Sequence, residues 1–234
     1  MNSIGQESED ESQKGVTIVG RTVYLKKWAW IAIVLAVVVS IGLSVLDKIG
    51  TRRAIAGIRA PFQTETDKGM FQVTVAGYKT VIDCKYAYDI EALVAHTKDY
   101  FSWDVGDQLS PRDLTLIWGR VAQHNTDVDF HWSQMTRRTM LWLDGSVDQE
   151  ALFGGEAGVQ MCLSNNHIIP ADDDVRWKLK IIRTGDHIRL RGYLVYVDGL
   201  RSDGATFSWY SSTTRTDTGD GACEVIYATD IEWL

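Results

Sequence analysis

The sequence has few cysteines, and none has the paired spacing of an ordinary metal site. Cys84, Cys162 and Cys223 lie far apart in the 234-residue chain. A zinc site or a redox-active dithiol normally uses a C-x-x-C pair, so the sequence favours neither. Three cysteines allow one disulfide with a leftover thiol, or three buried thiols, and the pairing stays open.

Positive charge is also scarce. The chain has 24 Lys and Arg against 31 Asp and Glu, which gives a net charge of −7. The excess of acid lies after Thr51, where 19 basic residues face 26 acidic ones. A protein that neutralises phosphate groups needs a basic surface, so the composition disfavours nucleic acid as a partner.

Sequence motifs that would define a chemistry are missing as well. The five histidines show no H-x-x-x-H or H-E-x-x-H spacing, and no P-loop or dinucleotide-binding fingerprint is present. Asp217-Thr218-Gly219 matches the tripeptide of aspartic proteases, but that chemistry needs two such aspartates and the chain has no second copy. We therefore expect no metal and no cofactor.

One long apolar run is present near the start of the chain. Residues 28–46 read WAWIAIVLAVVVSIGLSVL, without a charge, and include Trp28, Trp30 and Leu46. At about 1.5 Å per residue, such a helix nearly spans a bilayer core of about 30 Å. A cleavable signal peptide would be shorter and would end at a small-residue site, which is not found after Leu46. The run predicts a single-pass membrane anchor that contacts lipid.

The basic residues on the two sides of this run are equal in number, so charge alone does not decide its orientation. Four basic residues precede it and four follow it within the range that matters for topology: Lys14, Arg21, Lys26 and Lys27, then Lys48, Arg52, Arg53 and Arg59. Two of these residues directly adjoin the run on its amino-terminal side, and a short tail is simpler to leave in the cytoplasm. We expect the tail, residues 1–27, inside and the large domain outside, in a periplasm-like compartment.

The remaining sequence predicts a linker followed by a β-rich domain. Residues 47–70 show little periodicity and are interpreted as a stalk or linker, so the globular domain is expected at 71–234. Alternating or turn-bounded apolar segments predict strands. These segments are 71–75, 90–96, a hairpin over 130–143, 187–197, 207–211 and a last strand from 224.

Two short helices are expected in this domain. Ser110 and Pro111 have the order of a helix cap and first helical residue, and apolar residues then recur at helical spacing as far as Gln123. A second helix is expected after Pro170, where residues 172–174 are all aspartates and suit the positive end of a helix dipole.

The strand pattern favours a mainly β, α+β domain with a small barrel-like or OB-like sheet behind the transmembrane helix. Gly192 lies in the middle of the clearest strand and predicts a bulge or sharp bend, as a strongly curved sheet requires. Short strands of this kind are typical of small barrels. A sandwich is the alternative.

Three segments together resemble an uncharacterised family of bacterial membrane proteins. They are Leu163-Ser164-Asn165-Asn166-His167-Ile168-Ile169-Pro170-Ala171-Asp172, Arg189-Leu190-Arg191-Gly192-Tyr193-Leu194-Val195, and Ser211-Ser212-Thr213-Thr214-Arg215-Thr216-Asp217-Thr218-Gly219-Asp220-Gly221-Ala222-Cys223-Glu224. With Leu109-Ser110-Pro111-Arg112-Asp113-Leu114, the resemblance covers most of residues 86–227. It implies a bacterial inner-membrane location but no activity, because none is established for this family.

His167 and Cys223 are the candidate catalytic residues. A histidine can act as a general base, and a thiolate with a nearby imidazole can act as a nucleophile. The structural interpretation is that His167, Asn165 and Asn166 hydrogen-bond to the backbone and that Cys223 is buried in a strand.

The last of the three segments has a structural interpretation. Arg215, Asp217 and Glu224 are expected to form a polar network that fixes a turn, with Gly219 or Gly221 at positive φ.

Two classes of function therefore stay open. The anchor, the acidic β domain and the nine tryptophans favour a non-catalytic interaction domain, an accessory subunit of an inner-membrane or envelope assembly that binds other membrane or envelope proteins. The alternative is an enzyme that uses His167 or Cys223 in a cleft.

Overall fold

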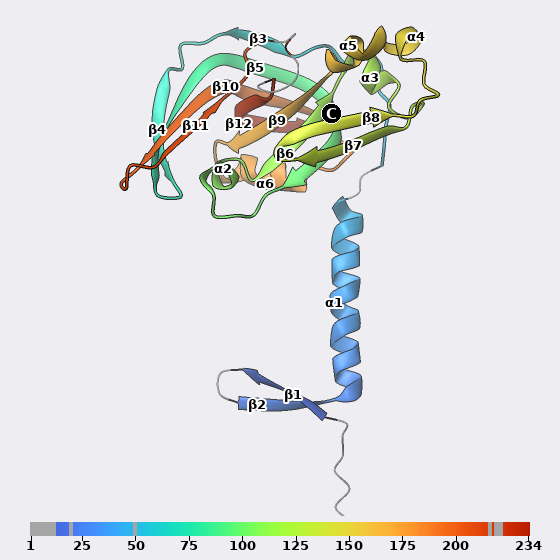
Figure 1. Cartoon of the computed structure of the whole chain (residues 1–234), viewed down its shortest axis with the longest axis vertical. Coiled ribbons are helices and arrows are strands. Elements are labelled where there is room, and N and C mark those ends of the chain that lie inside the picture. Colours follow the sequence, from blue (N-terminus) through green and yellow to red (C-terminus); the bar gives the residue numbers. More distant parts are fainter. Residues whose placement is uncertain (1–12, 19–20, 49–50, 215–216, 218–221) are drawn as a thin grey trace, which may run out of the picture. The chain divides into compact units, whose positions relative to one another are not determined.

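The structure is a computed structural model that describes residues 13–18, 21–48, 51–214, 217 and 222–234. Side chains are described for residues 28–39 and, within those ranges, from 51 onward. The chain divides into two compact units, Met1–Ile49 and Gly50–Leu234. Each unit is described by itself (Figure 1).

The first unit contains a hairpin and one helix. Strands β1 (Gln13–Ile18) and β2 (Arg21–Lys26) pair antiparallel within the segment expected as a tail, and α1 follows over Lys27–Lys48. The helical conformation predicted for residues 28–46 is confirmed. Over the described part of the chain, none of the helices has the combination of length and apolar character that crossing a membrane needs. Membrane insertion of residues 28–46 stays a prediction.

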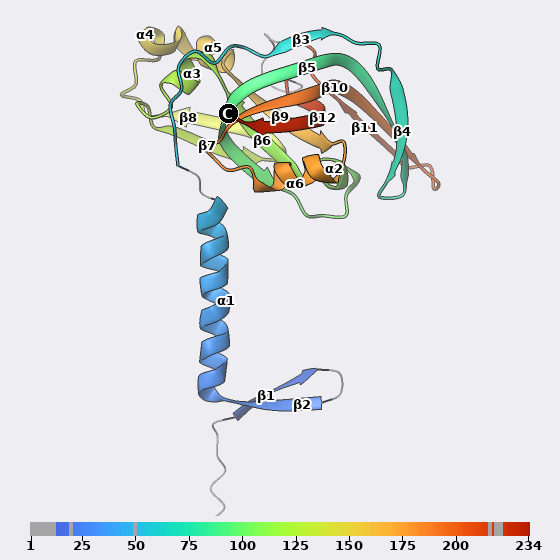
Figure 2. The same ribbon diagram turned by 180° about the vertical axis from the view of Figure 1, so that it is seen from behind.

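The second unit is mainly β and is built on one large sheet (Figure 2). The sheet order is β11-β10-β12-β9-β6-β5-β3, with β4 paired to β5 and a further pairing between β10 and β5. All neighbours are antiparallel except β12 and β9. The strands are β3 (Phe62–Glu65), β4 (Met70–Val75), β5 (Tyr78–Asp99), β6 (Arg112–Ile117), β9 (Leu163–Pro170), β10 (His187–Arg201), β11 (Thr206–Tyr210) and β12 (Glu224–Trp233).

Over the described residues of the second unit, a separate hairpin and five helices accompany this sheet. The hairpin consists of β7 (Phe130–Met135) and β8 (Arg138–Leu143), and it confirms the hairpin predicted for residues 130–143. The helices are α2 (Val105–Leu109), α3 (Gly119–Gln123), α4 (Gln149–Phe153), α5 (Gly155–Gln160) and α6 (Asp173–Ile181). The expectation of two short helices was therefore too low.

The predicted helix from Ser110 to Gln123 was wrong over its first half. Residues 112–117 form β6, and only 119–123 are helical. Every residue of β6 is buried, because the strand lies between β5 and β9 and is covered on both faces. A strand buried on both faces has no polar alternation, and its apolar residues can therefore fall at helical spacing.

Other predictions from local sequence are confirmed. The helix expected after Pro170 is α6, and the carboxylate of Asp172, its N-cap, accepts a hydrogen bond from the Val175 amide at 2.9 Å. The register of β10 against β12 shifts between Arg191 and Gly192, which is the predicted bulge. A Cβ on Gly192 would overlap the carbonyl oxygen of Tyr227, so only glycine fits there.

The segment expected as a linker packs in part onto the second unit. Ile58 is 4% exposed and belongs to the main core cluster, and Ile55 packs against it. The amide of Ile55 donates to the carbonyl oxygen of Ala122 at 3.0 Å. Strand β3 lies within the same segment. Isolated apolar residues without periodicity can thus still enter a core, which the sequence pattern did not reveal.

Candidate functional site

The candidate site starts from two adjacent strands in the middle of the sheet. Strands β6 and β9 pair so that Asp113 faces His167 and Thr115 faces Asn165. Because side chains alternate along a strand, Asn165 and His167 share one side of β9. Asn166 points to the other side, where its amide donates to the Leu114 carbonyl at 3.2 Å and to Ser164.

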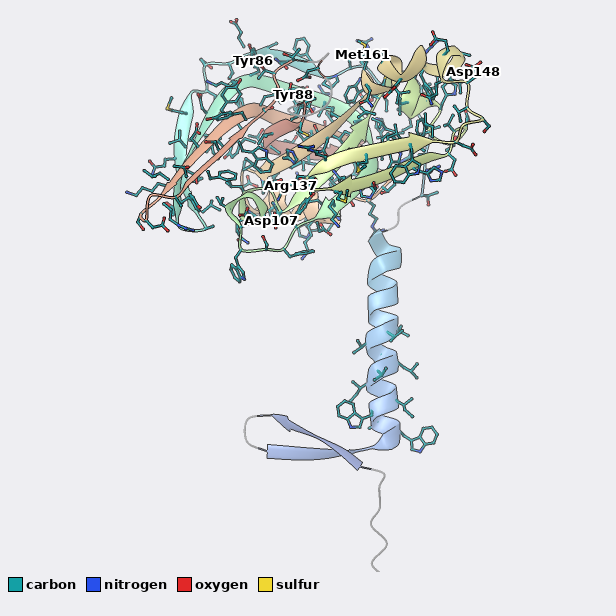
Figure 3. All side chains as sticks on the ribbon, viewed as in Figure 1. Tyr86, Tyr88, Asp107, Arg137, Asp148 and Met161 are labelled. Atoms are coloured by element: carbon teal, nitrogen blue, oxygen red, sulfur yellow. The ribbon has the colours of Figure 1, made fainter. Side chains whose placement is uncertain are left out.

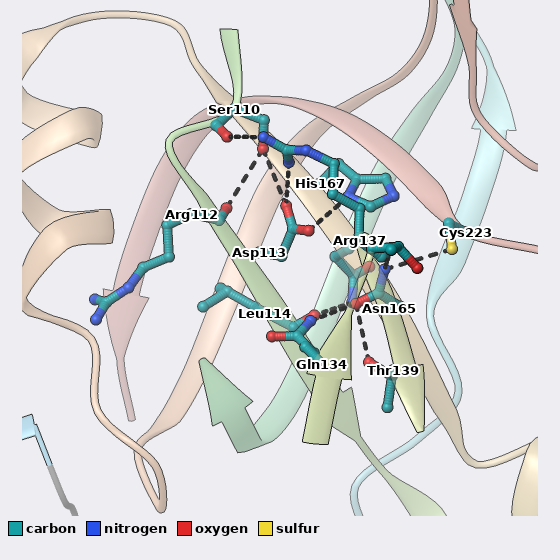
Figure 4. Close-up of polar contacts among 12 residues, drawn as sticks. Ser110, Arg112, Asp113, Leu114, Gln134, Arg137, Thr139, Asn165, His167 and Cys223 are labelled. Carbon is teal, nitrogen blue, oxygen red and sulfur yellow. Dashed lines mark hydrogen bonds and ion pairs between the residues drawn. The ribbon is translucent and has the colours of Figure 1, made fainter. Parts of the chain in front are cut away.

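Asp113 is the centre of a buried polar cluster (Figure 4). Its side chain is fully buried, and one carboxylate oxygen lies 3.0 Å from Nδ1 of His167. The other oxygen accepts a hydrogen bond from Arg137 at 2.9 Å. A buried carboxylate without partners is costly, and here both oxygens have a cationic or polar neighbour.

Arg137 lies at the tip of hairpin β7–β8 (Figure 3), and from there it reaches the Asp113 carboxylate. Thr136 and Arg137 have φ values of 50° and 60°, the geometry of a tight hairpin turn. The guanidinium also donates to Asp107 at 2.6 Å and to the Ser110 carbonyl at 3.0 Å. It lies over the rings of Tyr100 and Trp209, at 3.9 and 5.0 Å from their centroids.

These contacts change the proton affinity of two neighbouring groups. Burial opposes ionisation of Asp107, but hydrogen bonds from Ser102 and Arg137 outweigh it and lower the pKa of Asp107. Burial is the main reason why the pKa of Tyr100 is raised, and the Asp113 carboxylate adds to this. We call Arg137, Asp107, Asp113 and His167 the Arg137 cluster.

Asn165 connects the hairpin to the sheet beside this cluster. Its oxygen accepts hydrogen bonds from Gln134 at 2.5 Å and Thr139 at 2.9 Å. Its nitrogen donates to the Arg137 carbonyl at 2.8 Å and to Cys223 Sγ at 3.4 Å. The Asn165 side chain thus accepts two hydrogen bonds and donates two, and these bonds join the hairpin to the sheet.

A groove of about 820 Å³ lies on the other side of this joint. The walls come from β8, α5 and the start of β9, and we call it the hairpin groove. It combines apolar and polar side chains. The lining residues are Met135, Thr136, Arg138, Thr139, Met140, Glu156, Ala157, Gln160, Leu163, Ser164, Asn165, Asp217, Ala222 and Cys223.

The two candidate catalytic residues do not form a pair. His167 is 2% exposed, its ring packs on Trp209 with centroids 4.5 Å apart, and it does not line the groove. Among the described atoms, the Cys223 thiol hydrogen-bonds with Asn165 and not with His167. Burial raises the pKa of Cys223, which disfavours the thiolate that a nucleophile needs.

The other predicted site residues lie only partly within the described chain. Asp217 accepts a hydrogen bond from Ser212 at 2.5 Å, and Glu224 is buried at 1% exposure. Arg215, Gly219 and Gly221 lie outside the described residues, so the predicted network and its positive-φ glycine stay predictions. In the segment predicted to be a membrane anchor, Trp28 is 80% exposed, whereas the side chain of Leu46 is outside the described part.

The cysteines and possible metal ligands complete the inventory of the site. Cys84, Cys162 and Cys223 are free thiols, and Cys84 is buried. Across the described side chains, no group of three or more His, Cys, Asp or Glu residues is placed to hold a metal ion.

Sequence reasoning missed the residues that surround His167. Asp107, Asp113, Gln134 and Arg137 had no local motif, and Asp113 was assigned to the start of a helix. The available signal was the pair of adjacent charges Arg112-Asp113, directly before the stretch 114–118, which is apolar except for Thr115, because charges at a strand entrance need partners.

Comparisons of the chain with protein-family models, with curated proteins and with solved structures found no match.

Proposed function

We propose that the chain is a membrane-anchored, non-catalytic interaction domain that binds a polypeptide segment of a partner in the hairpin groove. The observation that carries this proposal is the groove itself, which has open space beside half-exposed methionines, and whose lining residue Cys223 has a pKa raised by burial. The partner would be another membrane or envelope protein. The anchor is residues 28–46, and the proposed location is the bacterial inner membrane with a periplasmic domain.

The groove has the side-chain chemistry of a peptide-binding surface. Met135 is 62% exposed and Met140 is 43% exposed, and both line the groove. Methionine is unbranched and polarisable, so exposed methionines adapt to apolar side chains of varied shape. Thr139 and Gln160 provide polar contacts beside them. This combination supports binding of an extended segment with apolar side chains.

The paired strands behind the hairpin groove provide a rigid frame for it. Strands β5, β10, β12, β9 and β6 are each paired to the next, and β6 is paired back to β5. Such a circuit of pairings supports the small barrel-like, OB-like sheet as our interpretation of the fold. The hairpin is fixed to it through Asn165 and the Arg137 cluster.

Site-specific photo-crosslinking tests the proposal. A photo-reactive residue in place of Met140 should form adducts with a defined protein in cells, whereas the same residue in place of Leu200, which is 57% exposed and outside the groove, should not. Met140→Glu should then weaken binding of the identified partner at least about tenfold, the effect of losing about 1.4 kcal/mol of contact. Identical adducts from both positions, or none from Met140, would contradict the proposal.

A further inference from the structure

The exposed face of α6 has an apolar ridge with basic neighbours. Trp177 is 59% exposed and Ile181 is 40% exposed, and they are four residues apart, so they lie one above the other on one face of the helix. The opposite face, with Val175 and Leu179, is buried in the core. Apolar side chains therefore project from both faces of α6, whereas a helix whose outer face contacts only water is expected to have polar side chains there.

The charges on α6 are unevenly distributed along its length. Exposed aspartates 173 and 174 lie in the first turn, and Asp174 pairs with Lys178 at 3.0 Å. The exposed basic residues Arg176, Lys180 and Arg183 lie around Trp177 and Ile181, toward the carboxyl end and just beyond it. The positive half of this helix is thus the half that carries the apolar ridge.

The carboxyl end of α6 is fixed by hydrogen bonds from Arg112. The guanidinium of Arg112 donates to the carbonyl oxygens of Leu179, Lys180 and Ile182 at 2.8, 2.7 and 3.0 Å. Those are carbonyls that a helix end leaves without partners. Asp99 pairs with the same guanidinium at 2.8 Å. The ridge is consequently presented by a fixed helix.

The carboxyl end of α6 is also the place where the chain enters the second unit. Gly185 has φ of 89°, and a Cβ on it would overlap the carbonyl oxygen of Thr51. Figures 1 and 2 agree that α6 and the first residues of this unit lie along the same border of it. From Lys48 to Thr51 there are three residue steps, which span at most about 11 Å.

From these observations we infer that the α6 face, Trp177 and Ile181 with Arg176, Lys180 and Arg183, binds the surface of the bilayer that holds α1. The inference rests on the membrane anchor of the proposed function. Tryptophan partitions to the membrane interface, and lysine and arginine beside an apolar ridge attract anionic headgroups. In the sequence, only three positions separate Lys48, the last residue of α1, from Thr51, which lies beside Gly185.

A second exposed segment lies along the same border. The loop before α2 lies on this side of the unit in both views (Figures 1 and 2), and its Phe101 and Trp103 are 83% and 90% exposed. Hydrogen bonds from the Ser102 amide to Asp107 and from the Gly106 amide to Asp104 hold this loop in shape. Two exposed aromatic side chains on the same border as α6 are suited to contact with a membrane interface.

Spin labelling of the full chain in vesicles tests the inference. Ile181→Cys carries a nitroxide label, and Phe62→Cys on β3, 67% exposed at the opposite border, is the matched control. Wild type treated in parallel measures labelling of the native thiols. In vesicles containing phosphatidylglycerol, the label at 181 should become accessible to oxygen and lose accessibility to a water-soluble nickel complex, whereas the label at 62 should keep it. Lys180→Glu should return the label at 181 toward water.

Three outcomes would overturn the inference, and they are distinguishable. A label at 181 that behaves like the label at 62, in a chain that resists extraction by alkaline carbonate, leaves the anchor intact and refutes docking of α6. A label shielded from both oxygen and nickel shows that protein covers this face. Release of the chain by carbonate refutes the anchor, and the inference falls with it.

Discussion

At the tip of hairpin β7–β8, Arg137 is inserted among buried carboxylates and aromatic rings, whereas the neighbouring residues Met135 and Met140 border an open groove. The same short hairpin therefore has a closed polar end and an accessible apolar side. Among the described residues, the closed end pairs Arg137 with Asp107 and Asp113. This difference indicates that His167 belongs to the scaffold, and it is the basis for our proposal that the groove residues bind the partner.

Asp113→Ala should break the closed end with the largest effect. It removes the partner of Arg137 and of His167 from a fully buried site. Removing one member of a buried ion pair typically costs about 3–5 kcal/mol, because a buried charge stays uncompensated. Urea unfolding should show this loss. Asp113→Asn, which keeps the shape, should cost less, and a wild-type unfolding curve for Asp113→Ala would show that the cluster contributes no stability.

Arg137→Met should have the next largest effect, about 2 kcal/mol, because two charged hydrogen bonds are lost from a site that is one-fifth exposed. It should also change the response to acid. The pKa of Asp107 is lowered in the folded protein below its unfolded value of about 3.9. Its contribution is therefore present above that value and is lost as the pH falls through the folded pKa.

The acid response separates the Arg137 cluster from a general loss of packing. Unfolding free energies measured from pH 6 downward should converge for wild type and Arg137→Met at acid pH. Arg137→Lys keeps a charge without the forked geometry and should lie between the two. Parallel curves over the whole range would show that the guanidinium acts through packing alone.

On the groove side, Met140→Glu should hardly affect stability. The side chain is 43% exposed and projects from the outer face of the hairpin, and surface substitutions usually change the free energy of unfolding by less than about 0.5 kcal/mol. A thermal melt close to wild type, together with the lost crosslink, would assign Met140 to recognition. A large drop in melting temperature would mean that the groove wall is part of the core.

Local sequence was sufficient where one short segment contains its own signal. The start of α6 after Pro170 and the Gly192 bulge of β10 are both set by residues within a few positions, and both were predicted correctly. Strand β6 was not, because its burial on both faces depends on β5 and β9, which are distant in sequence. The Arg137 cluster could not be predicted from local sequence for the same reason. Asp113 and His167 meet only through the β6–β9 register, 54 positions apart.

The smallest expected effect is kinetic and concerns the one candidate catalytic residue that does line the groove. Cys223 borders the open space, yet burial raises the pKa of its thiol, and the hydrogen bond from Asn165 offsets this only in part. Because the thiolate is the reactive form, alkylation by iodoacetamide at neutral pH should be slower in the folded protein than in the urea-unfolded chain. Mass spectrometry of the peptide that contains Cys223 measures both rates separately from Cys84 and Cys162. The buried Cys84, whose pKa burial also raises, is the internal comparison and should react slowly too. Faster alkylation of Cys223 in the folded state would show an activated thiol beside the groove, and the groove would then be better explained as the cleft of an enzyme than as a binding surface.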